Sequence, residues 1–505
     1  MSAPARSVTA GRDLVPQLFS NPELIRNVRT QLRRGRMLAA AGICASISLT
    51  LGYAFHAGAN PTNPGVWARE WLTWMVGIQA VVLAIGGGIA CVQAISREKE
   101  LNTFDFQRVT RLTPLELAMG KLFGAPAQAY FVFLCFMPAA LMAAALGKVR
   151  PSFLIAAYVF LILNSITFHA VSLVMSLVIE RAASAGAALL LLLMVGFSNV
   201  PGFGIMELGP LSPLYADVLI LESDWGAFWR ATSGVSVEFD QTSVQFFGTA
   251  VPHPLAAAVI FVTFTGWMVL ALVRNIKRDP AVYELYSPGQ FLGLILYANT
   301  ILIGFFAWRR FSPLTAQASL LVFNVLLMGV LGLALLRNRD QVRRRLRELG
   351  AKGASWAEAA WPAPYLVAGF LLVGPAVNLS TQWMKNAAPP WDLGLAFFRV
   401  AFIALWMVRD TLFLQWMNLR RLKRPLPMGM LYLMVFYLCA TIFSAMLDLY
   451  GAAGVSALMP MGVLGLEPAG WARDAMGWNV ALLAQLVPIA IFVNLLHDKL
   501  EELAK

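Results

Sequence analysis

The segment SREKELNTFDFQRVTRLTPLELAMGK, Ser96–Lys121, separates two long apolar runs at 71–95 and 121–147. It is the first long polar stretch inside an otherwise apolar part of the chain, and it carries two aromatic residues, Phe104 and Phe106. Each flanking run is long enough to cross a bilayer, which takes roughly 20 mostly apolar residues. The arrangement predicts a charged, aromatic-bearing elbow between two membrane-spanning helices.

Working outward from this elbow, the whole chain shows the same character. Its 505 residues are 59% hydrophobic and 13% charged, and the mean hydropathy is +0.67. Soluble domains lie nearer to about 45–50% apolar and 25% charged residues. The sequence therefore predicts an all-α polytopic integral membrane protein of about 12 transmembrane helices. The apolar runs are 37–57, 71–95, 121–147, 152–179, 183–200, 255–273, 291–307, 314–336, 363–382, 394–414, 428–449 and 475–496.

The formal net charge of +12 would suggest a nucleic-acid partner in a soluble protein. Here the cations alternate between loops: with the N-terminus inside, 29 of the 39 Lys and Arg residues lie in inside segments. Lys and Arg resist translocation, so this bias sets the orientation. We expect a multi-pass protein of the bacterial inner membrane with both termini cytoplasmic, the lipid bilayer as its surroundings and no nucleic-acid partner.

The order of loops repeats along the chain. In each set of six runs, a long inside loop follows the second run and a long outside loop follows the fifth. Such a plan is typical of two halves in parallel orientation. We predict three regions: a cytoplasmic N-terminus with an amphipathic elbow helix at 1–36, a first six-span half at 37–275, and a second six-span half at 276–505.

The elbow helix is predicted from NPELIRNVRTQLRRGR. Asn21 is favoured at a helix N-cap, Pro22 at the first helical position and Glu23 in the first turn. One face then carries apolar residues and the other carries cations, which is typical of a helix lying along a membrane interface. The apolar stripe is Leu24, Ile25, Val28 and Leu32, and the cations are Arg26, Arg29, Arg33 and Arg36.

Local helix signals also divide the opening segment. Thr113, Pro114 and Glu116 form a capping box that begins a helix running into the third apolar run, and Asn102 or Thr103 is suited to cap a short helix upstream. The segment is therefore predicted as helix, tight break and helix at the membrane surface. Phe104 and Phe106 have two candidate environments, lipid headgroups or a groove on another protein.

This segment resembles the coupling-helix region of ABC type 2 export permeases, the membrane subunits of a superfamily of drug, polysaccharide and antibiotic exporters. The residues that match are Glu98, Lys99, Glu100, Asn102 and Thr103, followed by Thr113, Pro114, Leu115, Glu116, Gly120 and Lys121. Two departures are Lys99, usually Arg, and Asn102, usually Gly. Asn tolerates the left-handed conformation better than most residues, so we expect the turn to form. The match is specific around 98–121 and covers about residues 20–275 in layout.

The resemblance implies that the loop docks into a separate ATPase subunit. That subunit would carry ATP and Mg, because this chain has no G-x-x-x-x-G-K-[ST] motif; no cofactor is expected on the chain itself. Either one chain supplies both halves, or it forms a homodimer or pairs with a second permease subunit. The implied coupling residues are Glu98, Lys99, Glu100, Asn102, Thr103, Phe104, Phe106, Arg108, Arg111, Thr113, Pro114 and Glu116.

Two further features remain open at this stage. The basic loop at 337–362 is either a degenerate coupling element or a positive flank that touches anionic lipid. Arg399 lies within an apolar run and is a candidate intramembrane polar site, the alternative being that it snorkels to the headgroups. The four cysteines and the lone His56 and His169 have no partner at metal spacing, so we expect no metal site.

Two other function classes are weighed against the exporter subunit. A twelve-span secondary transporter not driven by ATP would place ionisable groups near the bilayer midplane, and this sequence places few there. A membrane enzyme would need converging carboxylates, a His pair or an activated Ser. No such constellation is apparent in the sequence, so no catalytic residue is expected.

Overall fold

The computed structural model describes residues 21–58, 65–178, 243–247, 249–278, 284–306, 313–349, 355–382, 393–422, 425–449 and 475–504. The apolar run at 183–200 and most of the two long loops expected outside lie beyond these ranges. The chain divides into two compact units, Met1–Val244 with Val251–Tyr283, and Gln245–Ala250 with Glu284–Lys505. Each unit is described by itself.

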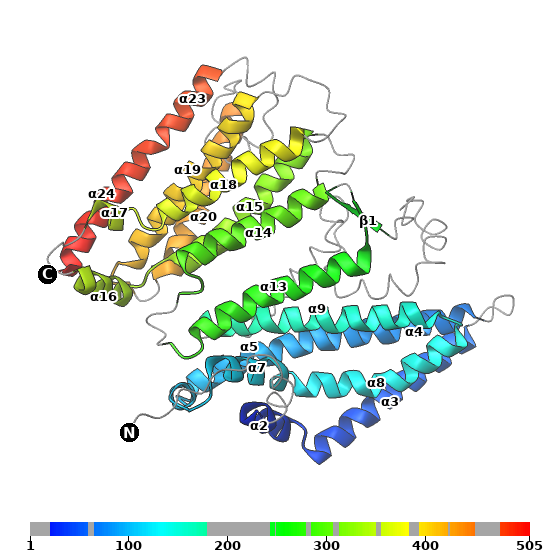
Figure 1. Cartoon of the computed structure of the whole chain (residues 1–505). Coiled ribbons are helices and arrows are strands. Elements are labelled where there is room, and N and C mark those ends of the chain that lie inside the picture. Colours follow the sequence, from blue (N-terminus) through cyan, green and yellow to red (C-terminus); the bar gives the residue numbers. More distant parts are fainter. Residues whose placement is uncertain are drawn as a thin grey trace, which may run out of the picture. The chain divides into compact units, whose positions relative to one another are not determined.

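Unit 1 contains the whole of the segment Ser96–Lys121. Its helices are α2 (Pro22–Gln31), α3 (Arg34–Ala57), α4 (Val66–Val81), α5 (Gly87–Glu100), α6 (Phe104–Arg108), α7 (Pro114–Gly124), α8 (Ala127–Leu146), α9 (Pro151–Val178) and α13 (His253–Asn275). A π-helical turn, η1 (Val82–Gly86), joins α4 to α5, so Val66–Glu100 forms one long rod. In Figure 1, α9 lies beside α13 and α5.

The core of unit 1 is an apolar cluster between α4, α8, α9 and α13. Its buried members include Trp71, Met75, Phe133, Phe136, Phe160 and Phe261. Away from this cluster the helices carry exposed apolar side chains, such as Leu49 at 68% and Tyr53 at 75% exposure. Apolar outward side chains are suited to lipid. A helix also satisfies its backbone hydrogen-bonding groups internally, as the lipid core requires.

Unit 2 is also mainly helical. Its helices are α14 (Pro288–Phe306), α15 (Pro313–Leu335), α16 (Arg339–Leu349), α17 (Trp356–Ala359), α18 (Ala363–Gln382), α19 (Leu393–Asn418), α20 (Pro425–Leu449), α23 (Ala475–Ala484) and α24 (Leu486–Ala504). Asn299 of α14 and Asn324 of α15 exchange two amide hydrogen bonds of 2.8 and 2.7 Å. The strands β1 (Ser243–Phe246) and β2 (Thr249–Pro252), whose residues are divided between the two units, pair in a two-stranded sheet that was not anticipated from the sequence.

Among the described residues, six helices are long and apolar enough to cross a membrane: Arg34–Ala57, Val66–Glu100, Ala127–Leu146, Pro151–Leu177, Ala258–Asn275 and Leu482–Ala504. Shorter apolar helices occur at Pro288–Gly304, Leu320–Gly329, Ala363–Val373 and Pro425–Ala440. The architecture is that of an α-helical membrane protein.

The structure corrects one detail of the third apolar run. The helix that starts after Thr113 does not continue through the run, because α7 ends at Gly124 and α8 begins at Ala127. Pro126 stands in the break. Proline has no N–H to donate to the carbonyl four residues earlier, so the hydrogen-bond ladder is interrupted and the run becomes two helices.

Candidate functional site

The elbow begins where α5 ends, at a turn centred on Asn102. The N–H of Thr103 donates to the Glu98 carbonyl at 2.9 Å, and the N–H of Asn102 donates to the Lys99 carbonyl at 3.0 Å. This pair of bonds is the Schellman motif, which needs a left-handed residue at the position of Asn102. Asn102 has φ of 55°. The turn expected from the sequence is therefore present with Asn in place of Gly.

The short helix α6 turns one aromatic residue inward and leaves the next outside. Phe104 is buried, with 2% of its surface exposed, whereas Phe106 is 74% and Val109 82% exposed. Thr103 stands at the N-cap position but makes no capping bond; its hydroxyl donates to the Glu98 carbonyl at 3.3 Å instead. The two Phe residues that the sequence treated alike thus have different environments.

The start of α7 carries the capping box predicted from the sequence. The N–H of Glu116 donates to the Thr113 hydroxyl at 3.2 Å, and the N–H of Thr113 donates to the Glu116 carboxylate at 2.7 Å. Pro114 occupies the first helical position. Because both bonds lie within four residues of sequence, this corner is fixed locally.

The elbow helix α2 packs against α7 through polar residues at both of its ends. Asn21 caps α2 as expected, accepting from the N–H of Glu23 at 3.0 Å, and its amide donates to the Glu116 carbonyl at 2.6 Å. Further along, Gln31 donates to the Ala125 carbonyl at 2.8 Å. A Cβ added at Gly120 would lie 2.8 Å from the Glu23 Cβ, so α2 and α7 are in backbone-close contact.

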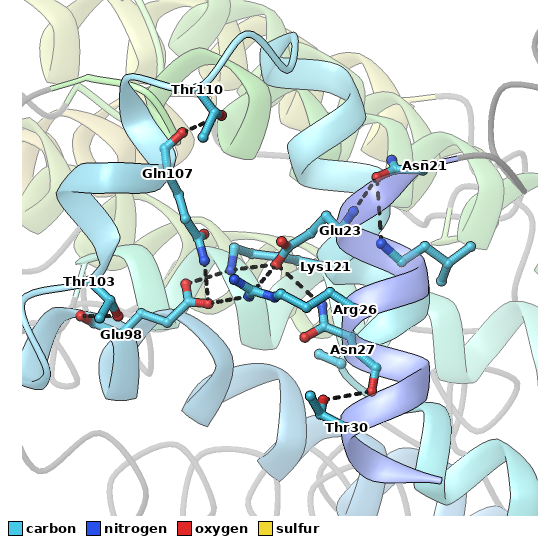
Figure 2. Close-up of polar contacts among 12 residues, drawn as sticks. Asn21, Glu23, Arg26, Asn27, Thr30, Glu98, Thr103, Gln107, Thr110 and Lys121 are labelled. Atoms are coloured by element: carbon cyan, nitrogen blue, oxygen red, sulfur yellow. Dashed lines mark hydrogen bonds and ion pairs between the residues drawn. The ribbon is translucent and has the colours of Figure 1, made fainter.

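At the centre of these elements is a buried charge cluster, which we name the Lys121 cluster: Glu23, Arg26, Glu98, Gln107 and Lys121 (Figure 2). Lys121 is 1% exposed. Its ammonium lies 3.1 Å from the Glu23 carboxylate and 2.5 Å from that of Glu98. Arg26 bridges the same two carboxylates at 2.8 and 2.7 Å, and the Gln107 amide donates to Glu98 at 2.6 Å.

The Lys121 cluster joins elements that are far apart in sequence. Glu23 and Arg26 come from α2, Glu98 from the end of α5, Gln107 from α6 and Lys121 from α7. Two cations face two carboxylates, so the charges balance, with Lys121 and Glu23 buried and Arg26 at the surface. A buried ammonium is stable only with such partners. The cluster therefore fastens α5, α6 and α7 to α2.

The remaining residues implied by the resemblance divide into inward and outward groups. The Lys99 ammonium donates to the Leu177 carbonyl at 2.6 Å, at the C-terminal end of α9, where a cation is favoured. Arg108 pairs with Asp105 at 2.6 Å. Glu100 and Arg111 are exposed. The outward surface of the elbow is thus apolar at Phe106 and Val109, with charged residues beside it.

Sequence reasoning did not identify the Lys121 cluster. It assigned Glu23 to the first turn of a helix, and it assigned Lys121 to the edge of a span. The available signal was weak: a Lys next to Gly120 at the start of an apolar run, where a charge needs a partner. The partner residues lie 98 and 23 positions away, which no local pattern reveals.

Unit 2 holds the intramembrane polar candidate. The Arg399 side chain on α19 is 1% exposed, so it is packed within the protein. A second group on α19 was not anticipated: Arg409 donates to the Asp410 carboxylate at 2.9 Å, to the side-chain amide oxygen of Gln485 at 2.9 Å and to the Tyr437 hydroxyl at 2.6 Å. Tyr437 in turn donates to Asp410. This closed set ties α19 to α20 and to the turn before α24.

The candidate metal ligands are scattered over the part of the chain that the structure describes. No group of three or more His, Cys, Asp or Glu side chains there is arranged to hold a metal ion. His169 instead contacts the Leu83 carbonyl at 2.8 Å and the Tyr130 hydroxyl at 3.0 Å, which is a helix-to-helix contact beside η1.

Comparison with protein-family models, with curated proteins and with solved structures finds no match to this chain.

Proposed function

We propose that this chain is the membrane subunit of an ATP-driven exporter of the ABC type 2 class, moved by a separate ATPase subunit that binds ATP and Mg. The observation that carries the proposal is the elbow at residues 98–116. It presents two exposed apolar side chains, Phe106 and Val109, on a short helix that is fastened by a buried ion-pair cluster. A protruding apolar surface on a rigid support is suited to a groove on a partner protein.

The rigidity of the support is as important as the exposed residues. A flexible loop would absorb the motion of a partner, whereas an element held at both ends passes the motion on. Here α6 is held by the Schellman turn upstream and by the capping box downstream. The amide of Gln107 holds its middle to Glu98. The elbow can therefore act as a lever on α5 and α7.

Twelve spans in two six-span halves are part of the proposal. Six long and four shorter apolar helices are present among the described residues. Helix α19 (Leu393–Asn418) adds a further apolar helix interrupted by charges, and the run at 183–200 lies outside the described ranges. We propose that both termini are cytoplasmic, in a bacterial inner membrane, because the distribution of Lys and Arg favours that orientation.

The alternative of an ATP-independent secondary transporter would draw on the ionisable groups of α19. Arg409 and Asp410 lie within a span, as coupling residues do. Their hydrogen bonds are made to each other and to Gln485 and Tyr437, so they form a closed clamp between helices. This arrangement favours a structural role for the pair, and with it the exporter subunit.

The proposal is tested by replacing two exposed apolar residues, Phe106→Asp within α6 and Val109→Asp at its C-cap. Since neither side chain is packed in the protein, the variant should insert and fold like wild type. It should lose co-purification of the proposed ATPase subunit, by roughly tenfold or more, because charges replace the apolar contacts at the centre of an interface.

The matched control is Leu422→Asp, which changes another exposed apolar residue, in the loop after α19. It should leave co-purification unchanged. Equal recovery of the ATPase with the double variant and with wild type would remove the docking role from α6.

A further inference from the structure

Only three residues separate the end of α15 at Leu335 from the start of helix α16 (Arg339–Leu349). Helix α16 therefore lies next to the end of an apolar helix. Figure 1 shows it near the C-terminal end of α24. It is rich in arginine, and its position after the second apolar helix of its half matches that of the elbow in unit 1. The two elements differ, however, in the side chains that they expose.

The apolar side of α16 is already occupied. Val342 and Leu346 are buried, at 5% and 7% exposure. They line a small cavity together with Leu419, Leu496 and Leu500, so the partner of this side is α24 and the end of α19. No large apolar side chain of α16 is exposed. Unlike α6, this helix has nothing apolar to offer a protein groove.

The opposite side of α16 is cationic. With 3.6 residues per turn, Arg344 and Arg347 fall on the side away from Val342 and Leu346, Arg343 lies at the edge of that side, and all three are exposed. We call them the α16 arginine face. Asp340, in the first helical turn where an acid is favoured, and Glu348 share this side, and three arginines against two carboxylates leave a net positive charge.

Acidic residues near α16 have partners within unit 2. Glu358 contacts Arg337 at 2.9 Å and Arg345 at 3.5 Å, and Glu348 contacts Arg345 at 3.4 Å. On α24, Glu502 pairs with Lys499. The pairs with Glu358 hold the start and edge of α16, whereas the Arg345–Glu348 pair lies along α16 itself. The arginines of the α16 arginine face still outnumber the carboxylates on that side.

Aromatic residues at the same end of unit 2 are typical of a membrane interface. Trp356 on α17 is 55% exposed, and Trp361 stacks under the Arg337 guanidinium at 3.6 Å. Exposed Trp close to the end of an apolar helix is typical of the headgroup layer. Polybasic segments next to a membrane-spanning helix bind anionic headgroups in that layer.

We propose that the α16 arginine face is a docking site for anionic phospholipid headgroups. The bound chemistry is a phosphate diester at the membrane surface, contacted by guanidinium groups that suit phosphate geometry. Because the apolar side of α16 is covered by α24, the contact is electrostatic and lies at headgroup depth. This inference does not depend on the proposed ATPase partner, since it concerns unit 2 alone.

The test is native mass spectrometry of the full chain after reconstitution with equal amounts of phosphatidylglycerol and phosphatidylcholine. Wild type should retain phosphatidylglycerol preferentially. In the double variant Arg343→Gln, Arg347→Gln, the preference for phosphatidylglycerol over phosphatidylcholine should fall about fivefold for each arginine removed. The charge-preserving variant Arg343→Lys, Arg347→Lys should keep most of it. The control Lys148→Gln, Arg150→Gln removes two exposed cations from the turn between α8 and α9 and should change little.

Three results would overturn the proposal. The first is an unchanged lipid preference in the Gln variant. The second is a loss in the Lys variant as large as that in the Gln variant, which would show that charge is not the cause. Finally, ATPase co-purification that depends on Arg343 and Arg347, with lipid retention unaffected, would assign the face to a protein partner.

Discussion

At the scale of single residues, Lys121 decides the character of the site. It is an ammonium with 1% exposure, in contact with the carboxylates of Glu23 and Glu98. Removing one member of a buried ion pair costs about 3–5 kcal/mol, because the other is left buried without its counter-charge. Arg26, whose side chain is 48% exposed, can compensate only in part, since it is screened by solvent.

Lys121→Met should therefore destabilise unit 1 by about 3–5 kcal/mol, measured as a loss of thermal stability in detergent. Adding Glu23→Gln and Glu98→Gln should recover part of this loss, because the uncompensated carboxylates are removed. Lys148→Met, at an exposed position, is the control and should stay within about 0.5 kcal/mol of wild type. If Lys121→Met melts like the control, the Lys121 cluster does not hold the elbow.

At the scale of elements, the contact between α2 and α7 depends on the absence of side chains. A Cβ at Gly120 would lie 2.9 Å from the Asn21 Oδ1 and 2.8 Å from the Glu23 Cβ. At Gly124 the nearest atom is the Asn27 Cβ, at 3.0 Å. Two glycines one turn apart thus let α2 approach closely enough for Glu23 to reach Lys121, as in other small-residue helix contacts.

Gly120→Ala should loosen α2 from α7 without unfolding the apolar core. Amide hydrogen exchange of residues 22–31 should become faster, by roughly tenfold for a loss of about 1.4 kcal/mol in local stability. Gly42→Ala on α3, where nothing lies within 4 Å of an added Cβ, is the matched control and should leave exchange in α2 unchanged. Equal exchange in both variants would show that α2 has room for the methyl group.

At the scale of the whole molecule, each unit combines apolar helices with one polar element beside them. In unit 1 that element is the elbow, and it exposes Phe106 and Val109. In unit 2 it is α16, and it exposes Arg343 and Arg347. We infer that the two elements serve different surfaces, a protein and a membrane, although they occupy matching places in the order of helices.

The proposed orientation predicts that cysteines introduced at two positions on opposite sides of the membrane are labelled differently in intact cells. Arg150→Cys, before α9, should react with a membrane-impermeant thiol reagent added outside. Arg343→Cys, on α16, should react only after the membrane is permeabilised. The four native cysteines lie in helices expected to span the membrane, so wild type gives the background. Labelling of Arg343→Cys from outside would reverse the proposed orientation.

The sequence by itself determined the local corners of the site. It predicted the Asn21 cap, the Thr113–Glu116 capping box and the turn at Asn102, and the structure confirms all three. It also predicted a helical membrane protein. These features depend on hydrogen bonds between residues a few positions apart, or on the cost of exposing polar backbone to lipid, and both can be read from a short stretch.

Only the tertiary structure decided which side chains meet. Phe104 and Phe106 are two positions apart, yet one is buried and the other exposed, because the neighbouring elements cover one side of α6. Glu23, Glu98 and Lys121 come together across 98 and 23 positions of sequence. Burial of a charge depends on partners brought by the folded chain, and no periodicity or spacing encodes that distance.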